Sequence, residues 1–91
     1  MNLDIFKSEL TVVILCGGKG LRLRPITKNI PKPLVKINNK SILEHIIQYF
    51  LKFKIKNFII ATGYKNKLID KFIADKFNNK NIKIVYTGLN S

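Results

Sequence analysis

Residues 15–27 read LCGGKGLRLRPIT, and the tripeptide Pro31-Lys32-Pro33 follows shortly after them. An apolar run from Thr11 to Cys16 leads directly into this stretch, as a buried strand leads into a bend. Glycine has no Cβ, so a bend rich in glycine can bring bare backbone N–H groups close to a ligand. The cationic side chains just beyond the bend predict a ligand with several negative charges, most plausibly a polyphosphate.

The segment around this bend is strongly basic. No acidic residue lies between Glu9 and Glu44, whereas the same interval contains seven basic ones: Lys19, Arg22, Arg24, Lys28, Lys32, Lys36 and Lys40. The whole chain has a net charge of +12, which is a feature of nucleic-acid-binding proteins. Its 17 basic residues are almost all lysines, however, and asparagine and isoleucine are also abundant. AT-rich coding produces this composition, so we interpret most of the lysines as a solvated surface.

Length and composition restrict the class of protein. Ninety-one residues make at most one small domain, and a hydrophobic fraction of 46% is enough for a core. A single cysteine, Cys16, excludes an intrachain disulfide and a cysteine-based metal site, which fits a reducing cytoplasm. Residues 1–10 lack the layout of a signal peptide, and no apolar run is long enough to cross a bilayer. We expect a cytoplasmic protein with an N-terminal extension, 1–10, before a domain portion, 11–91.

The pattern after residue 10 alternates between strand and helix periods. We expect strands at 11–16, 57–62 and 82–86, a short extended piece at 34–37, and helices from 42 to about 53–55 and from 66 or 67 to 77. The first strand is apolar throughout, which predicts that both its faces are covered. Helical crossovers imply a parallel sheet, so the predicted fold is a Rossmann-like α/β sheet. Ligands of such sheets bind beyond the carboxyl ends of the strands, where the glycine-rich bend lies.

Each predicted helix has its own start signal and apolar stripe. Ser41 and Glu44 have the spacing of a capping box. Spacing predicts an inner face of Ile42, Leu43, Ile46, Ile47, Phe50 and Leu51 for the first helix, and of Leu68, Ile69, Phe72, Ile73 and Phe77 for the second. Asp70 and Asp75 fall on the outer face of the second helix, and Asn78-Asn79 provides a left-handed C-cap.

The glycine pattern differs from the common phosphate-binding motifs. Leu23 stands where Gly-x-Gly-x-x-Gly needs its third glycine, and no Gly-Lys-Ser/Thr follows at Walker spacing. Instead, Leu-x-Gly-Gly-x-Gly-x-Arg-Leu-x-Pro-x-Thr followed by Pro-Lys-Pro resembles the signature of the sugar-1-phosphate nucleotidyltransferases. The resemblance runs from about Thr11 to Ser91, and it identifies the chain as the N-terminal portion of such a domain.

The resemblance implies transfer of a nucleotidyl group from an NTP to a sugar 1-phosphate, with release of pyrophosphate and with the help of Mg²⁺. Positioning two anions and stabilising developing charge is the main work of such a catalyst. Carried over by position, the nucleotide-binding residues would be Leu15, Cys16, Gly17, Gly18, Gly20 and Leu21, and the catalytic ones Arg22 and Lys32. Arg22 would pair with the leaving pyrophosphate, and Lys32 would reach the α-phosphate or the sugar phosphate.

Two departures from the family pattern matter. Leu21 replaces a frequent threonine, which removes a hydroxyl but leaves the backbone N–H. The five acids of this chain do not stand at strand ends, and the family's metal-binding aspartates come after Ser91. We therefore expect no metal site in this chain, metal ligands beyond Ser91, and no catalysis by these residues alone. The intact enzyme could be a homo-oligomer.

The residues leave the subtype open. The last six residues, 86–91, resemble glucose-1-phosphate cytidylyltransferases, which favours CTP; a mannose-1-phosphate guanylyltransferase type or another nucleotide-sugar pyrophosphorylase is the alternative.

From other classes, we considered a small basic nucleic-acid-binding module and a fragment with no function. The phenylalanines fall on the apolar stripes and leave no stacking platform, which disfavours nucleic acid. His45 is expected in a surface or packing role, Glu44 as a cap, and Tyr64 could approach a ligand.

Overall fold

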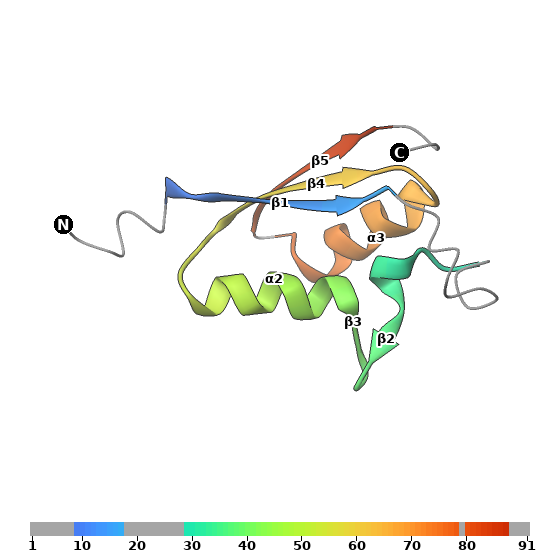
Figure 1. The fold of residues 1–91 in the computed structure, drawn as a ribbon, viewed down its shortest axis with the longest axis horizontal. Helices are drawn as coiled ribbons and strands as arrows, with labels where there is room; N and C mark the ends of the chain where they lie inside the picture. The colour runs from blue at the N-terminus through green and yellow to red at the C-terminus, as the bar shows by residue number, and fades with distance from the viewer. Residues whose placement is uncertain (1–8, 18–28, 79, 88–91) are drawn as a thin grey trace.

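The computed structural model describes residues 9–17, 29–78 and 80–87, arranged as a small α/β layer (Figure 1). The elements in chain order are β1 (Thr11–Cys16), η3 (Lys32–Leu34), β2 (Lys36–Ile37), β3 (Lys40–Ser41), α2 (Ile42–Lys52), β4 (Asn57–Thr62), α3 (Asn66–Lys76) and β5 (Asn81–Tyr86). Each strand and helix expected from the sequence is present, with bounds within about two residues of the prediction.

The main sheet is parallel, with the strand order β1-β4-β5. Val13 pairs with Ile59 and Ile59 with Lys83, and the register is unbroken along all three strands. This confirms the predicted Rossmann-like α/β class. Because the strands are parallel and in register, their carboxyl ends meet at one edge of the sheet.

Both helices lie on the same face of the sheet (Figure 1). The chain passes from β1 to β4 and from β4 to β5, each time to the next strand on the same side. Because such crossovers are right-handed, both connecting helices lie on one face of the sheet. The core therefore forms between this face and the helices, from Ile14, Cys16, Leu43, Ile47, Phe58, Ile60, Ile69, Ile73 and Phe77.

The opposite face of the sheet is not covered by any described element, so the expectation that β1 is buried on both faces is wrong. Alternate residues of β1 are exposed, and Leu15 retains 81% of its accessible surface. Successive side chains of a strand point to opposite faces, so helices on one side bury only every second residue. A strand is buried on both faces only when helices cover both sides of the sheet, which requires crossovers in both directions along the strand order.

Helix α2 begins with Ser41 as its N-cap, as predicted, but the described residues do not show the reciprocal bond from the Ser41 N–H to the Glu44 side chain. The Ser41 hydroxyl accepts a hydrogen bond from the Glu44 backbone N–H at 3.0 Å, which satisfies one of the free donors of the first turn. Leu43 and Ile47 are fully buried, and Ile46, Phe50 and Leu51 pack partly against the core. The helix ends at Lys52 with Phe53 as its C-cap.

Helix α3 begins at Asn66, after Lys65 in a left-handed conformation. Its inner face is as predicted except for Leu68, which is 41% exposed. Leu68 lies one position before the buried Ile69, about 100° around the helix, and so points away from the sheet. Phe77 is the C-cap with φ −131°, and Asn78 has no positive φ, so Asn78 does not supply the predicted left-handed cap; Asn79 lies outside the described residues.

The segment 34–37 belongs to a separate hairpin and not to an extended strand. Leu34 closes the 3₁₀ turn η3, and only Lys36–Ile37 pairs, antiparallel, with Lys40–Ser41. Asn38 and Asn39 both have positive φ, which is the conformation of a tight type I′ turn. A bond from the Ile42 N–H to the Val35 carbonyl (3.0 Å) ties the hairpin to α2.

The core prediction can be tested with two large-to-small substitutions. We expect Ile47→Ala to lower the free energy of unfolding by about 2–5 kcal/mol, because a fully buried side chain leaves a cavity. Leu15→Ala should lower it by less than about 1 kcal/mol, because Leu15 is exposed in this chain. Urea unfolding measures both values. Equal losses for the two variants would contradict the one-sided core.

Candidate functional site

Interactions between neighbouring strands tie the carboxyl edge of the sheet together. The Gly17 carbonyl accepts from the Tyr64 N–H at 3.3 Å, which joins the ends of β1 and β4. The Thr62 carbonyl accepts from both the N–H (2.7 Å) and the hydroxyl (2.8 Å) of Thr87, which joins β4 to the residue after β5. Thr62 is fully buried. The exits of all three strands are therefore held in fixed relation to one another.

The structure describes half of the predicted site residues. Leu15, Cys16, Gly17 and Lys32 lie in described ranges, whereas Gly18, Gly20, Leu21 and Arg22 lie outside the described residues. Cys16 and Gly17 are buried at the end of β1, and the Lys32 side chain is exposed on η3. The positions of the glycine-rich bend and of Arg22 thus stay predictions.

Three of the four described site residues line one hollow. It has a volume of about 250 Å³, and its walls are Ile14, Leu15, Cys16, Lys32, Pro33, Ile42, Leu43 and Ile46. Ile14, Leu15 and Cys16 are consecutive in β1, so their side chains point alternately to the two faces of the sheet. A hollow that contacts all three residues therefore lies along the unpaired edge of β1. Among the described residues of this lining, Lys32 is the only charged one. The end of β1 and the proline-flanked lysine, 16 positions apart in the sequence, therefore line the same hollow.

The backbone around Lys32 is well fixed. Pro31 is buried, and its carbonyl accepts from the Leu34 N–H at 2.9 Å. The Lys32 carbonyl accepts from the Val35 N–H at 3.0 Å, which closes the 3₁₀ turn. Proline fixes its own φ, so the prolines on either side of Lys32 limit the conformations of this turn. Only the lysine side chain remains free to move toward an anion.

The single cysteine is a packing residue. Cys16 is 2% exposed, and burial raises the pKa of its thiol from the ordinary 9.0 to about 11, because the thiolate is poorly solvated there. It is a member of the core cluster. Its contribution to a ligand is therefore restricted to its backbone, as the family resemblance implies.

Other residues singled out in the sequence have structural roles. His45 Nε2 lies 2.7 Å from the Ile37 carbonyl and fastens the hairpin to α2, which agrees with a surface or packing role. Glu44 accepts from Gln48 through its Oε2 and occupies the capping box. Tyr64 is half-buried at the strand edge, and the Lys65 ammonium lies 5.7 Å from the centre of its ring.

The hollow also contains residues that sequence analysis assigned only to the core. These are Ile42, Leu43 and Ile46, which all come from the N-terminal part of α2. Helical periodicity predicts which residues of α2 face the sheet, but it does not show which of them border a hollow at the edge of the core. The Thr62–Thr87 connection was also missed, since nothing local in the sequence marks two threonines 25 positions apart as partners.

Asp70 corrects another prediction. It is half-buried and not on the outer face, and its Oδ1 is buried with no hydrogen-bond partner among the described residues. Asp75 is exposed, as predicted. In ranges 9–17, 29–78 and 80–87, no three His, Cys, Asp or Glu side chains gather where they could hold a metal ion.

Comparison with known proteins decides the family. A family model described as nucleotidyl transferase matches residues 11–89. The chain belongs to this family. It is 45% identical over 78 residues to the D-glycero-alpha-D-manno-heptose 1-phosphate guanylyltransferase of Campylobacter jejuni, covering 86% of this chain and 34% of that protein. It is 42% identical over 66 residues to a probable glucose-1-phosphate cytidylyltransferase of Bacillus subtilis, covering 72% of this chain and 26% of that protein.

Solved structures agree with this assignment. The CTP:phosphocholine cytidylyltransferase of Streptococcus pneumoniae has a TM-score of 0.74 at 33% identity, over 85% of this chain and 32% of its own. HddC of Yersinia pseudotuberculosis, complexed with GMP-PN, has a TM-score of 0.68 at 32% identity, over 89% of this chain and 36% of its own. The present nucleotidyltransferase chain thus spans about a third of the length of these relatives. No helix in its described part has the length and apolarity needed to span a membrane.

The burial of Cys16 predicts slow alkylation. With a pKa of about 11, about one thiol in a thousand is ionised at pH 8, against about one in ten at the ordinary pKa of 9.0. We expect iodoacetamide to modify the folded chain about 100-fold more slowly than the urea-unfolded chain. Because the folded pKa is raised, this thiol also favours folding below pH 9, and its contribution is lost as the pH rises toward 11. Equal rates in both states would contradict this assignment.

The two aspartates of α3 provide a matched test of burial. Asp70→Ala should raise the free energy of unfolding by about 1 kcal/mol, because it removes a desolvated oxygen that has no described partner. Asp75→Ala is the control on the same helix and should change it by less than about 0.5 kcal/mol. Thermal or urea unfolding measures both. A loss of stability in Asp70→Ala would show that the carboxylate has a partner.

Proposed function

We propose that this chain supplies the NTP-binding part of an enzyme that transfers a nucleotidyl group to a sugar 1-phosphate and releases pyrophosphate. The observation that carries the proposal is the hollow at the open edge of β1, where the entry to the glycine-rich bend meets Lys32. Both features lie at the carboxyl edge of a parallel sheet, where ligands of such folds bind. The relatives named above, which act on heptose 1-phosphate and glucose 1-phosphate, support the substrate class.

The described residues suit phosphate recognition by position and charge. Lys32 carries the only charge among the described residues of the lining, and backbone hydrogen bonds of Pro31 and Lys32 close its turn. An ammonium held in this way acts as a point charge toward an α-phosphate or a sugar phosphate. Arg22, through its fixed guanidinium fork, would bind the departing pyrophosphate. The reaction needs the two anions held in line, so both cations act by positioning and by stabilising charge.

Mg²⁺ is proposed for the intact enzyme and not for this chain. The described residues bring no three metal-ligating side chains together, so no step of the reaction runs through a metal that they hold. We infer that the metal ligands and most sugar contacts belong to parts that the longer relatives possess in addition. Accordingly, the 91-residue chain should bind nucleotide without turning it over.

The identity of the base is a finer proposal. The sequence at 86–91 favours CTP, and among the relatives are both cytidylyltransferases and guanylyltransferases. We retain CTP as the prediction and GTP as the alternative. Binding of CTP, GTP, UTP and dTTP to the chain, measured side by side, ranks them directly. Tighter binding of GTP would replace the prediction with the guanylyltransferase type.

Substitution of Lys32 tests the site itself. We expect Lys32→Ala to weaken NTP binding by about tenfold or more, because a charge-assisted contact contributes about 1.5–3 kcal/mol. Arg22→Ala should have an effect of similar size. Lys36→Ala removes the same charge from an exposed position four residues away and is the control. Calorimetric titration measures all four proteins. Unchanged affinity in both Lys32→Ala and Arg22→Ala would refute the proposed site.

A further inference from the structure

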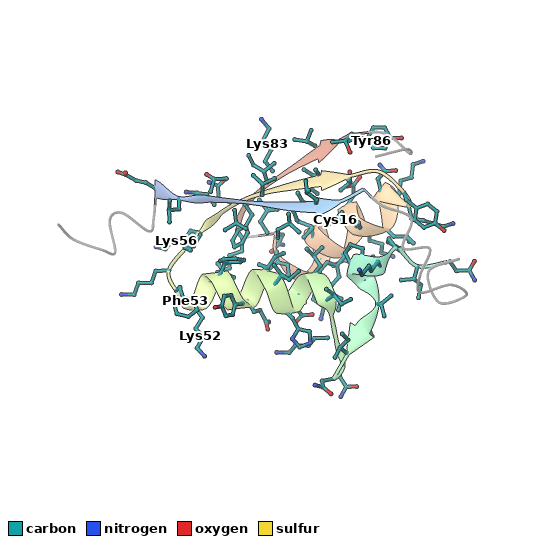
Figure 2. The ribbon with its side chains drawn as sticks, viewed as in Figure 1. Cys16, Lys52, Phe53, Lys56, Lys83 and Tyr86 are labelled. Carbon is teal, nitrogen blue, oxygen red and sulfur yellow. The ribbon has the colours of Figure 1, made fainter. Side chains whose placement is uncertain are left out.

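Lysines gather at the edge of the sheet opposite the proposed nucleotide site. Lys52 is the last residue of α2, Lys54 and Lys56 follow it, and Lys80 stands just before β5. Figure 2 shows Lys52, Phe53 and Lys56 at the end of the molecule where the strands begin, with Cys16 toward the end where they finish. This cluster is therefore separate from the hollow beside Lys32.

Three of these lysines line a hollow of their own. It has a volume of about 470 Å³, and its walls are Leu51, Lys54, Lys56, Lys80 and Asn81. Among the described residues, the lining consists of three lysines, one asparagine and one leucine, with no acidic residue. Small-molecule sites commonly have volumes of about 300–1,000 Å³. The size therefore suits a small ligand, and the lining suits an anion.

The strand register explains why the positive charges are close together. Asn57 pairs with Asn81 at the start of β4 and β5, and the Asn81 amide donates to the Asn57 side-chain oxygen at 2.6 Å. Lys56 and Lys80 directly precede this pair, so the parallel register places them at neighbouring strand starts, and both line the same hollow. Like charges near one another repel, and an anion between them offsets that repulsion. Within the described ranges, neither Lys56 nor Lys80 has a side-chain hydrogen bond or an ion pair.

A simpler explanation accounts for only part of the cluster. Cations near the C-terminus of a helix interact favourably with its exposed carbonyls, and Lys52 is in the last turn of α2 with Lys54 just beyond it. A helix end carries the equivalent of about half a negative charge, and its effect falls off within one turn. Lys56 lies beyond the last turn of α2, and Lys80 comes from a different part of the chain, so the helix end does not account for either of them.

We propose that this hollow binds a small anion that carries at least two phosphate groups. Such an anion would place negative charge between Lys56 and Lys80 and relieve their mutual repulsion, with Lys54 as a third contact. An ammonium is a compact point charge with three donors, so several lysines can share neighbouring phosphates without demanding a single geometry. Because it stabilises the folded chain by relieving repulsion, the anion also raises the unfolding temperature.

A single-stranded nucleic acid is the competing ligand class. The expectation that all phenylalanines lie on apolar stripes is wrong for Phe53, which is 43% exposed, and Tyr49 next to it is also exposed. Their ring centroids are 5.1 Å apart, so the two rings pack against each other. Nucleic-acid tracks combine stacking rings with a basic groove that follows a backbone. Here the lysines surround a hollow of small-molecule size, which favours the small anion.

Titration of the isotope-labelled 91-residue chain with pyrophosphate, followed by NMR, tests the proposal. We expect the amide signals of residues 54–56 and 80–81 to shift in a saturable manner. The double variant Lys56→Gln/Lys80→Gln should bind at this site at least tenfold more weakly. Lys67→Gln/Lys71→Gln removes two exposed charges from α3 and should retain the affinity within about twofold. Circular dichroism confirms that both variants are folded.

The same titration separates this site from the proposed nucleotide site. Shifts at residues 54–56 and 80–81 should persist in Lys32→Ala, whereas any shifts at residues 32–35 should weaken. Shifts confined to the region of Lys32 would overturn the second site and leave the first intact. Equal weakening in both double variants would show a diffuse charge effect and overturn it as well. Tighter binding of single-stranded DNA than of pyrophosphate, lost in Phe53→Ala, would reassign the surface to nucleic acid.

Discussion

The parallel pairing of β1 with β4 is the constraint on which the other features depend. It aligns Cys16 with Thr62, so the bend after β1 and the turn after β4 begin at the same edge, where the Gly17 carbonyl meets the Tyr64 N–H. The same direction of crossover places α2 against β1 and brings its first turn beside Lys32. A site made of backbone and one lysine therefore follows from the topology and needs few specialised side chains.

Local signals predicted most of the fold, because each depends on residues close together in the chain. The Ser41 cap and the stripe of α2 are set by spacings of three and four, and they are present as predicted. The errors concern relations between distant elements. Leu15 is exposed because both crossovers run in one direction and leave its face of the sheet uncovered. The exposure of Leu68 depends on how α3 is rotated about its axis, and the burial of an Asp70 oxygen depends on which residues pack beside α3. None of these is encoded in a local pattern.

For the candidate site too, the sequence indicated some features and not others. Leu15, Cys16 and Lys32 were singled out from a family motif, and the structure shows that they line one hollow, whereas their roles toward a ligand stay predictions. Cys16 shows the limit of residue type as a guide, because burial makes its thiol a poor nucleophile although it stands at a ligand edge. The Thr62–Thr87 connection could not be predicted, since it requires the register of β4 with β5.

The net charge of this protein has more than one physical meaning. At the carboxyl edge the described lining of the hollow has a single lysine, and its turn is closed by backbone hydrogen bonds. At the amino edge the geometry is simple and the charge is dense, because two strand starts in register bring Lys56 and Lys80 together. Codon bias can explain why so many residues are lysine, but it does not choose their positions. The strand register places Lys56 and Lys80 at neighbouring strand starts, and under our proposal a bound anion offsets their positive charge.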